Sequence, residues 1–258
     1  MNRSRRVAGR FLPTMLAFGL LFGLWEAAVA VWEVKRLVLP PPSAVVADIW
    51  RNPSYWRHHA WVTGQEALAG FVLALTVALL LAVAIVHSRH AERALLPVLT
   101  MVQVTPIIAL AVPLFILFRS FGLGPKIVMS ALVTFIPFTV NAIAGLRAID
   151  ADTLEVLRSV DASPREVLVR LRLPHALPYL FAAARVCVGL ALIGALVAEW
   201  SGSSEGLGYV MVTGQRQFAT TAVWAAVFVL TAMGLVGTAL VGFAERRLLR
   251  WHPTSAPR

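Results

Sequence analysis

The sequence predicts an all-α membrane protein with six transmembrane helices. Apolar residues make up 59% of the 258 positions and charged residues only 14%, and the mean hydropathy is +0.76. A soluble domain is nearer half apolar and about a quarter charged. The apolar residues gather in long runs, and only helices or closed barrels satisfy their backbone groups in lipid. These runs are too long and continuous for barrel strands, so we expect helices.

Six apolar runs are long enough to cross a bilayer. About 20 helical residues, each rising about 1.5 Å, span a hydrocarbon core about 30 Å thick. The second, fourth and sixth runs contain no charged residue. We therefore expect a tail over 1–10, one transmembrane domain over 11–245 and a second tail over 246–258. The six runs cover residues 11–32, 67–86, 94–118, 127–146, 176–198 and 222–244.

The arginine and lysine residues predict the orientation, because cytoplasmic connections carry an excess of them. One alternate set of connections holds 15 of the 23 Arg and Lys residues and the other holds 7, while Arg185 lies inside the fifth run. The arginine-rich set includes both tails and the long connection after the fourth run. We therefore expect both termini and that connection to be cytoplasmic.

A second interpretation of the first run remains open. Arginines, an apolar stretch and Ala28-Val29-Ala30 are typical of a cleavable signal peptide, whose loss would leave five spans. The apolar stretch is long for a signal, however, and Trp25, Glu26 and Trp32 crowd the cleavage position. We favour a retained span.

Several classes of function are disfavoured. The formal charge of +10 is split among short polar segments, which suits membrane topology better than a nucleic-acid groove. The single Cys187 offers neither an intrachain disulfide nor a cysteine metal cluster. His87, His90 and Glu92 do not form an HExxH motif, and no further ligand lies at a useful spacing from them. With no nucleophile-and-base arrangement in view, we expect no catalytic site, metal or cofactor in this chain.

The connection over 150–172 is unlike the rest of the chain. Nine of its residues are charged, and its apolar residues follow helical spacings that predict two short amphipathic helices. Between them, residues 163–166 form a capping box with proline at the first helical position. Pro174 and Pro178 mark the return to the membrane. The apolar stripes consist of Leu154, Leu157 and Val160 in the first helix, and Val167, Leu168 and Leu171 in the second.

The residues alone leave two roles open for this helix–turn–helix. A short helical pair with an apolar stripe and a charged rim fits a groove on another protein. Alternatively, the stripe packs against the cytoplasmic ends of the chain's own spans.

The segment resembles the signature loop of the binding-protein-dependent ABC importer permeases. That loop reads Glu-Ala-Ala, three residues, Gly, nine residues and Ile-x-Leu-Pro, and the spacing here is intact from Glu155 to Pro174. Val156 and Leu157 replace the two alanines and require a roomier groove. Asp161 replaces the glycine; aspartate tolerates the left-handed turn that glycine adopts freely, at a higher cost. It also places a carboxylate where the ATPase of such a system approaches.

Four further motifs resemble the branch of this family that imports nitrate, sulfonates, taurine and pyrimidine precursors. In chain order they are residues 105–109 (TPIIA) with Pro113-Leu114, residues 122–124 (GLG) with Lys126, Ala162-Ser163, and Ala198-Glu199 with residues 206–209 (GLGY).

The resemblance implies a type I ABC importer permease fold and a transport cycle. The loop over 150–174 docks on a cytoplasmic ATPase that uses ATP and Mg, and an extracytoplasmic binding protein delivers a small solute. The chain has no GxxxxGK[ST] loop, so the ATPase is expected to be another polypeptide. Six spans are half of the family's usual channel, which implies a homodimer. The coupling residues implied are Glu155, Leu157, Asp161, Ala162, Ser163, Pro164, Leu171, Leu173 and Pro174.

The expected solute is a sulfonate, nitrate or a pyrimidine precursor of thiamine, and residues 202–209 favour the last. Polar groups are costly in lipid, so those in and beside the spans are candidates for the pathway, although hydrogen bonding between helices or an interfacial position explains them equally well. Pro106, Pro113 and Pro137 are expected to allow kinks. The pathway candidates are Gln103, Thr105, Pro106, Asn141 and Glu199.

Two other classes of function remain as alternatives. An ion-gradient-driven secondary carrier usually relies on internal repeats and ionisable groups near the membrane midplane, and no clear repeat is found. A membrane-embedded enzyme is disfavoured because no catalytic constellation is found.

Overall fold

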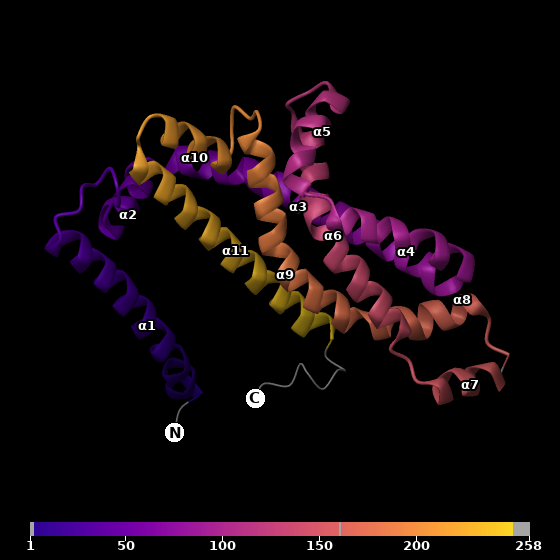
Figure 1. Cartoon of the computed structure of the whole chain (residues 1–258). Coiled ribbons are helices and arrows are strands. Elements are labelled where there is room, and N and C mark those ends of the chain that lie inside the picture. Colours follow the sequence, from indigo (N-terminus) through magenta and orange to yellow (C-terminus); the bar gives the residue numbers. More distant parts are fainter. Residues whose placement is uncertain (1–2, 160, 250–258) are drawn as a thin grey trace. The chain divides into compact units, whose positions relative to one another are not determined.

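A computed structural model describes residues 3–159 and 161–249, and every regular element within them is helical (Figure 1). The chain divides into two compact units, Met1–His59 with Val210–Val229 and Ala60–Tyr209 with Leu230–Arg258. The elements are α1 (Arg3–Val31), α2 (Pro42–Arg51), α3 (Pro53–His87), α4 (Arg89–Val104), η1 (Ile107–Leu110), α5 (Ala111–Phe118), α6 (Leu123–Arg147), α7 (Ala151–Ser159), α8 (Pro164–Glu166), η2 (Val167–Arg172), α9 (Leu173–Trp200), α10 (Leu207–Arg216) and α11 (Thr220–Leu248).

Four helices of the described chain are long and apolar enough to cross a membrane. They are Pro53–His87, Leu123–Arg147, Pro164–Trp200 and Thr220–Leu248, and they contain the second, fourth, fifth and sixth predicted runs. The first run corresponds to a shorter apolar stretch, Met15–Val31, within α1. Since α1 begins at Arg3, the helix already includes most of the segment expected to be a tail. Residues 250–258 of the second tail lie outside the described residues.

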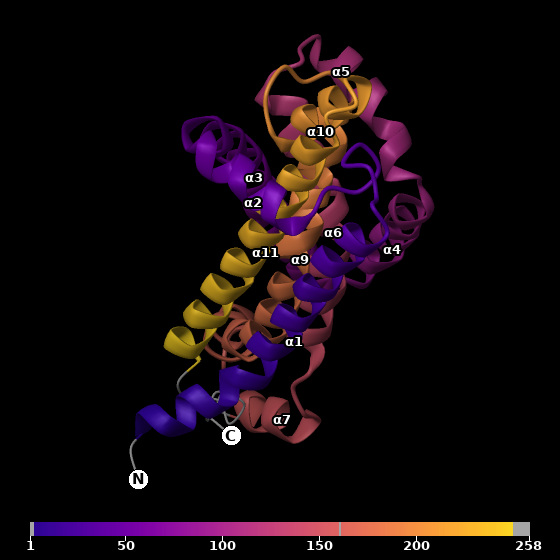
Figure 2. The same cartoon turned by 90° about the vertical axis from the view of Figure 1, so that its left-hand side faces the viewer.

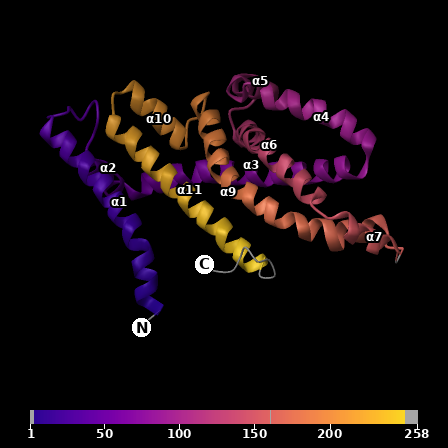
Figure 3. The ribbon, with the colours of Figure 1, turned by 60° about the horizontal axis from the view of Figure 1, so that its bottom comes forward.

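The third predicted run, 94–118, is not one straight helix. α4 ends at Val104, and the next helical segment, Ile107–Phe118, is bent away from it by 92°; Figure 3 shows α5 turning away from the line of α4. Thr105 is extended, with ψ 126°, because the ring of Pro106 disfavours the helical conformation in the preceding residue. Pro137, by contrast, lies inside the continuous helix α6. Of these two prolines, only Pro106 ends its helix.

In the second unit, α6 and α9 form the most extensive helix pair (Figure 1 and Figure 2). Small residues let the two backbones approach each other: a Cβ added at Gly194 would lie 2.6 Å from Ser130 Cα, and one at Gly145 would lie 2.8 Å from Ala176 Cα. Ser130 Oγ also donates to the Ala191 carbonyl at 3.0 Å. Close packing of this kind holds helices together where lipid removes the hydrophobic driving force.

The first unit is built on α1, α2 and the first part of α11. The Glu26 carboxylate in α1 accepts hydrogen bonds from Ser43 N at 3.0 Å and from Ser43 Oγ at 2.6 Å, which joins α1 to α2. Trp25 meets Trp224 edge-on, with 4.9 Å between ring centroids. Glu26, for which the sequence favours an interfacial position, therefore also connects two helices within this unit.

We predict that Gly194→Ala destabilises the protein by about 1–3 kcal/mol, because the added methyl group meets the α6 backbone. Gly189→Ala is the matched control: it lies on the same helix, and a Cβ there meets nothing within 4 Å. Thermal unfolding of the purified protein in detergent measures both. Equal melting temperatures for the two variants would contradict the close α6–α9 packing.

Candidate functional site: the hairpin between α6 and α9

A helical hairpin lies between α6 and α9, and its cytoplasmic position stays a prediction. α7 (Ala151–Ser159) is its first arm, and the chain then turns at Asp161, whose φ of 53° is left-handed. The Ala162 N–H donates to the Leu157 carbonyl at 3.1 Å and closes the turn. Aspartate thus adopts the conformation expected at the glycine position of the signature loop.

The capping box is also confirmed. Ser163 Oγ accepts from Glu166 N at 3.3 Å, and Ser163 N donates to Glu166 Oε2 at 3.1 Å. Pro164 occupies the first turn of the helix, where its missing N–H costs nothing. The Glu166–Arg170 pair is exposed and 3.8 Å long, so it contributes little.

The sequence suggested a separate short helix for the second arm, and this prediction was wrong. Residues 164–200 are continuous, and the π-helix η2 (Val167–Arg172) joins the arm to α9. The Leu173 N–H donates to the carbonyl of Leu168, five residues earlier, immediately before Pro174. Such a wider turn is one way for a helix to accommodate a proline. The return to the membrane therefore involves no break in the helix.

The apolar residues of the hairpin divide between the two roles left open by the sequence. Leu168 and Leu173 pack against a buried cluster formed by α3, α6 and α9. Val167 and Leu171 instead line a groove of about 400 Å³ between the two arms. The rest of the groove lining consists of Thr153, Val156, Leu157, Asp161, Ala162, Glu166 and Arg170. The hairpin thus has one face held by its own spans and an apolar groove with charged groups at its edges.

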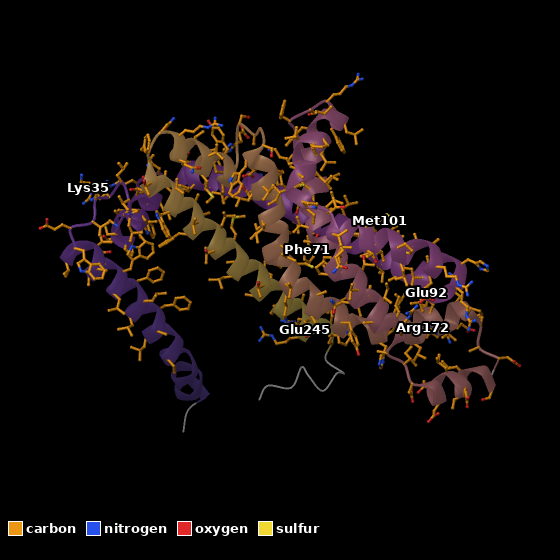
Figure 4. All side chains as sticks on the ribbon, viewed as in Figure 1. Lys35, Phe71, Glu92, Met101, Arg172 and Glu245 are labelled. Carbon is orange, nitrogen blue, oxygen red and sulfur yellow. The ribbon has the colours of Figure 1, made fainter. Side chains whose placement is uncertain are left out.

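Two polar contacts lie at the base of the hairpin. The Arg172 guanidinium donates to the Leu146 carbonyl at 2.9 Å and so satisfies a carbonyl in the last turn of α6. Arg147 pairs with Glu92 at the start of α4, with 2.9 Å between nitrogen and oxygen. Figure 4 labels Arg172 and Glu92 at this end of the helices. Glu155, the first residue of the signature, is exposed on α7.

The pathway candidates do not form one site. Gln103, Thr105 and Pro106 lie at the end of α4 and the break that follows it. Thr105 Oγ1 donates to the Met101 carbonyl at 2.8 Å, and Asn141 Nδ2 donates to the Pro137 carbonyl at 2.9 Å. Each side chain is therefore hydrogen-bonded to the backbone carbonyl four residues before it. Glu199 is 2% exposed and belongs to a different, buried cluster.

That cluster contains residues whose role the sequence did not reveal. Lys126 Nζ on α6 lies 2.8 Å from Glu66 Oε1 on α3 and 2.7 Å from Ser203 Oγ. Thr63 Oγ1 on α3 donates to Glu199 Oε1 on α9 at 2.7 Å. The sequence places Lys126 just before the fourth apolar run, in a connection expected to be external, and gives no role to Glu66. The only signal was that Lys126 and Glu199 each belong to a motif quoted for the family resemblance.

Comparison with known proteins decides the family. Residues 70–250 match the family described as binding-protein-dependent transport system inner membrane component. The chain belongs to this family. It is a membrane-spanning subunit of an ABC importer, and the ion-gradient-driven carrier is not favoured.

The permease is similar along nearly its whole length to characterised family members. It is 32% identical to the formylaminopyrimidine transport permease protein ThiX of Halalkalibacterium halodurans, over 93% of this chain and 96% of that protein. It is 35% identical to the riboflavin transport system permease protein RibX of Chloroflexus aurantiacus, over 93% of this chain and 90% of that protein. These matches support a multi-pass protein of the inner membrane.

The fold of the permease is that of a known importer. It matches a chain of the MetNI methionine ABC transporter in an inward facing conformation with a TM-score of 0.59, over 76% of this chain and 96% of that chain. The sequence identity is 21%, so the likeness concerns the fold alone.

We predict that Asp161→Gly stabilises the turn by up to about 1 kcal/mol, because glycine adopts the left-handed conformation without the steric cost that other residues meet. Asp161→Ala is the matched comparison, since alanine keeps that cost and loses the polar side chain. Hydrogen exchange of the peptide over 151–163 should slow in the glycine variant and quicken in the alanine variant. Slower exchange in Asp161→Ala than in the parent protein would refute the role of the turn conformation.

Proposed function

We propose that this chain is one half of the channel of an ABC importer and that the hairpin over 150–174 couples it to a separate cytoplasmic ATPase. The observation that carries the proposal is the capped hairpin itself. Its turn and its capping box lie within residues 155–174, the segment that keeps the spacing of the family's signature loop, and residues of the same segment line the apolar groove. A short helical pair with an apolar groove and charged edges is suited to docking on another protein.

Six membrane crossings are consistent with the helices. The four long helices supply four, the apolar part of α1 supplies one, and the bent pair of α4 with η1 and α5 supplies the other. With this count both termini and the hairpin lie on the arginine-rich, cytoplasmic side. The hairpin is then within reach of a cytoplasmic ATPase.

The coupling site is assigned to the exposed arm and the turn. Glu155 is exposed on α7, and Leu157 lines the groove between the arms. Leu173 and Pro174 act from the base, where Leu173 packs on the spans. The remaining proposed coupling residues are Asp161, Ala162, Ser163, Pro164 and Leu171. The chain itself needs no cofactor, because ATP and Mg are used by the ATPase.

The transport cycle follows from a two-state bundle. ATP binding draws the two ATPase subunits together and moves the attached hairpins, so the spans alternate between inward-open and outward-open states. An extracytoplasmic binding protein delivers the solute. A second copy of this chain completes the channel, and the exposed apolar side chains of Val104, Ile108 and Ile116 along the bent segment offer a surface for it. Gln103, Thr105, Pro106, Asn141 and Glu199 remain the proposed pathway residues.

The proposed solute is a small nitrogen heterocycle. Two relatives that cover nearly the whole chain are named for formylaminopyrimidine and riboflavin transport, and both compounds are nitrogen heterocycles. A sulfonate or nitrate is the other class of solute that the family resemblance allows. Ligand binding by the partner binding protein would separate these classes.

Charge reversal at the exposed signature residue tests the coupling role. Glu155→Lys should reduce ATP-driven uptake by about tenfold while leaving membrane insertion intact, because it removes one charge-assisted contact of the kind worth about 1.5–3 kcal/mol and adds repulsion. Uptake and ATP hydrolysis are measured together in proteoliposomes that contain the whole transporter. Glu33→Lys is the control, since Glu33 is also exposed but lies in the connection predicted to be external.

A cysteine at the cap gives an independent readout. Ser163→Cys should form a crosslink to the ATPase that depends on the nucleotide present. Undiminished coupled uptake in Glu155→Lys, together with no crosslink under any nucleotide condition, would overturn the docking role.

A further inference from the structure

A buried polar cluster joins three spans to the connection that follows α9. Its members Glu66, Lys126 and Glu199 come from α3, α6 and α9, and their exposed fractions are 0%, 5% and 2%. Buried charges persist in folded proteins when they are paired or hydrogen-bonded. The charges of the cluster must therefore be compensated within the protein. Water can solvate the exposed charges of the hairpin.

The charges of the cluster do not balance if every group is ionised. Lys126 brings one positive charge and lies 2.8 Å from Glu66 Oε1. The Glu199 carboxyl group lies beside Glu66, and it accepts hydrogen bonds from Thr63 Oγ1 and the Gly208 N–H. In the connection after α9, Glu205 is exposed to solvent. Among these three side chains, two carboxylates face one ammonium, so one negative charge has no cation within the set.

A single proton resolves both this imbalance and a hydrogen-bonding defect. Glu66 Oε2 is buried and has no hydrogen-bond donor among the residues that the structure describes. Two ionised carboxylates in contact cannot donate to each other. A proton on Glu199 turns the contact into a hydrogen bond and makes the cluster neutral, with Lys126 and Glu66 as the ion pair. Carboxyl pairs that share a proton in this way titrate as a unit.

The cluster also holds the chain after α9 in place. Thr63 Oγ1 accepts from Leu207 N at 2.8 Å, and Glu199 accepts from Gly208 N, so both side chains satisfy N–H groups in the first turn of α10. Lys126 reaches Ser203 Oγ at 2.7 Å in the connection itself. A Cβ at Gly206, whose φ is 102°, would lie 2.1 Å from Glu199 Oε1. The glycines leave room for the carboxyl group to meet the backbone.

We infer that Glu66, Lys126 and Glu199 form a buried proton-binding site, in which the two carboxyl groups share one proton that neutralises the three side chains. In this state the site acts as a latch: its hydrogen bonds hold the connection over 201–206 and the start of α10 against α3, α6 and α9. The site lies outside the proposed coupling hairpin. It needs no contact with the ATPase, although Glu199 is also one of the proposed pathway residues.

The charge balance is tested by variants of the purified full-length chain. Lys126→Met leaves the Glu66 carboxylate unpaired and should lower the yield of monodisperse protein by about tenfold. Lys126→Met combined with Glu66→Gln removes both charges of the pair and should restore the yield to within about twofold of the parent protein. Glu199→Gln imitates the protonated acid and should also stay within about twofold. Arg147→Met is the control, because the Arg147–Glu92 pair is partly exposed and should matter little.

Hydrogen exchange tests the latch in variants that fold. Exchange in the peptide over 200–209 should quicken by about tenfold in Glu199→Ala, which removes the acceptor of the Gly208 N–H, and by less in Glu199→Gln. A yield of Glu199→Gln as low as that of Lys126→Met, or a double variant no better than Lys126→Met, would overturn the shared proton. Unchanged exchange in Glu199→Ala would overturn the latch. Since these readouts need no ATPase, they succeed or fail separately from the coupling experiments.

Discussion

The close packing of α6 against α9 is the contact on which both functional regions depend. Gly194 and Gly145 allow the two backbones to approach at two levels along the pair, and a membrane span gains little from burying apolar side chains unless they pack this closely. The hairpin connects α6 directly to α9 at one end of the pair. Lys126 and Glu199 stand at its other end, near the start of α6 and the end of α9. The geometry of one helix pair thus positions both the hairpin that is proposed to dock on the ATPase and the polar cluster.

The two ends are stabilised in different ways. The hairpin is fixed by local contacts, a left-handed Asp161 and a capping box between Ser163 and Glu166, and it remains exposed around its groove. Leu168, Leu173 and Arg172 hold its base against the spans, whereas its first arm and its turn rely on local contacts, which suits the proposed docking on a moving partner. The cluster around Glu66 is buried and depends on contacts between distant segments, where an unpaired charge is costly. That contrast makes the hairpin suited to movement and the cluster suited to holding a fixed arrangement.

The bent segment after α4 illustrates how one proline changes a span. The apolar run over 94–118 carries enough hydrophobic residues for a crossing, yet Pro106 forces Thr105 out of the helical conformation and the chain turns by 92°. Pro137 does not interrupt α6. Hydropathy alone does not distinguish the two cases, because it records how apolar a run is and not where its backbone is continuous. Every proline disfavours the helical conformation in the residue before it, so only the structure shows that Pro106 ends its helix and Pro137 does not.

The sequence by itself determined the features that depend on near neighbours or on composition. Apolar runs predicted the four long helices, and the capping box and the turn at Asp161 each involve residues within about four positions of one another. Motifs at fixed spacing in the sequence also indicated the family to which the chain belongs. Only the tertiary structure showed that Lys126 meets Glu66, 60 positions away, and that Thr63 meets Glu199, 136 positions away. Such pairs depend on how the helices pack against one another. The residue pattern of one helix shows which of its faces is apolar, but not which distant side chain a buried charge on that helix will contact.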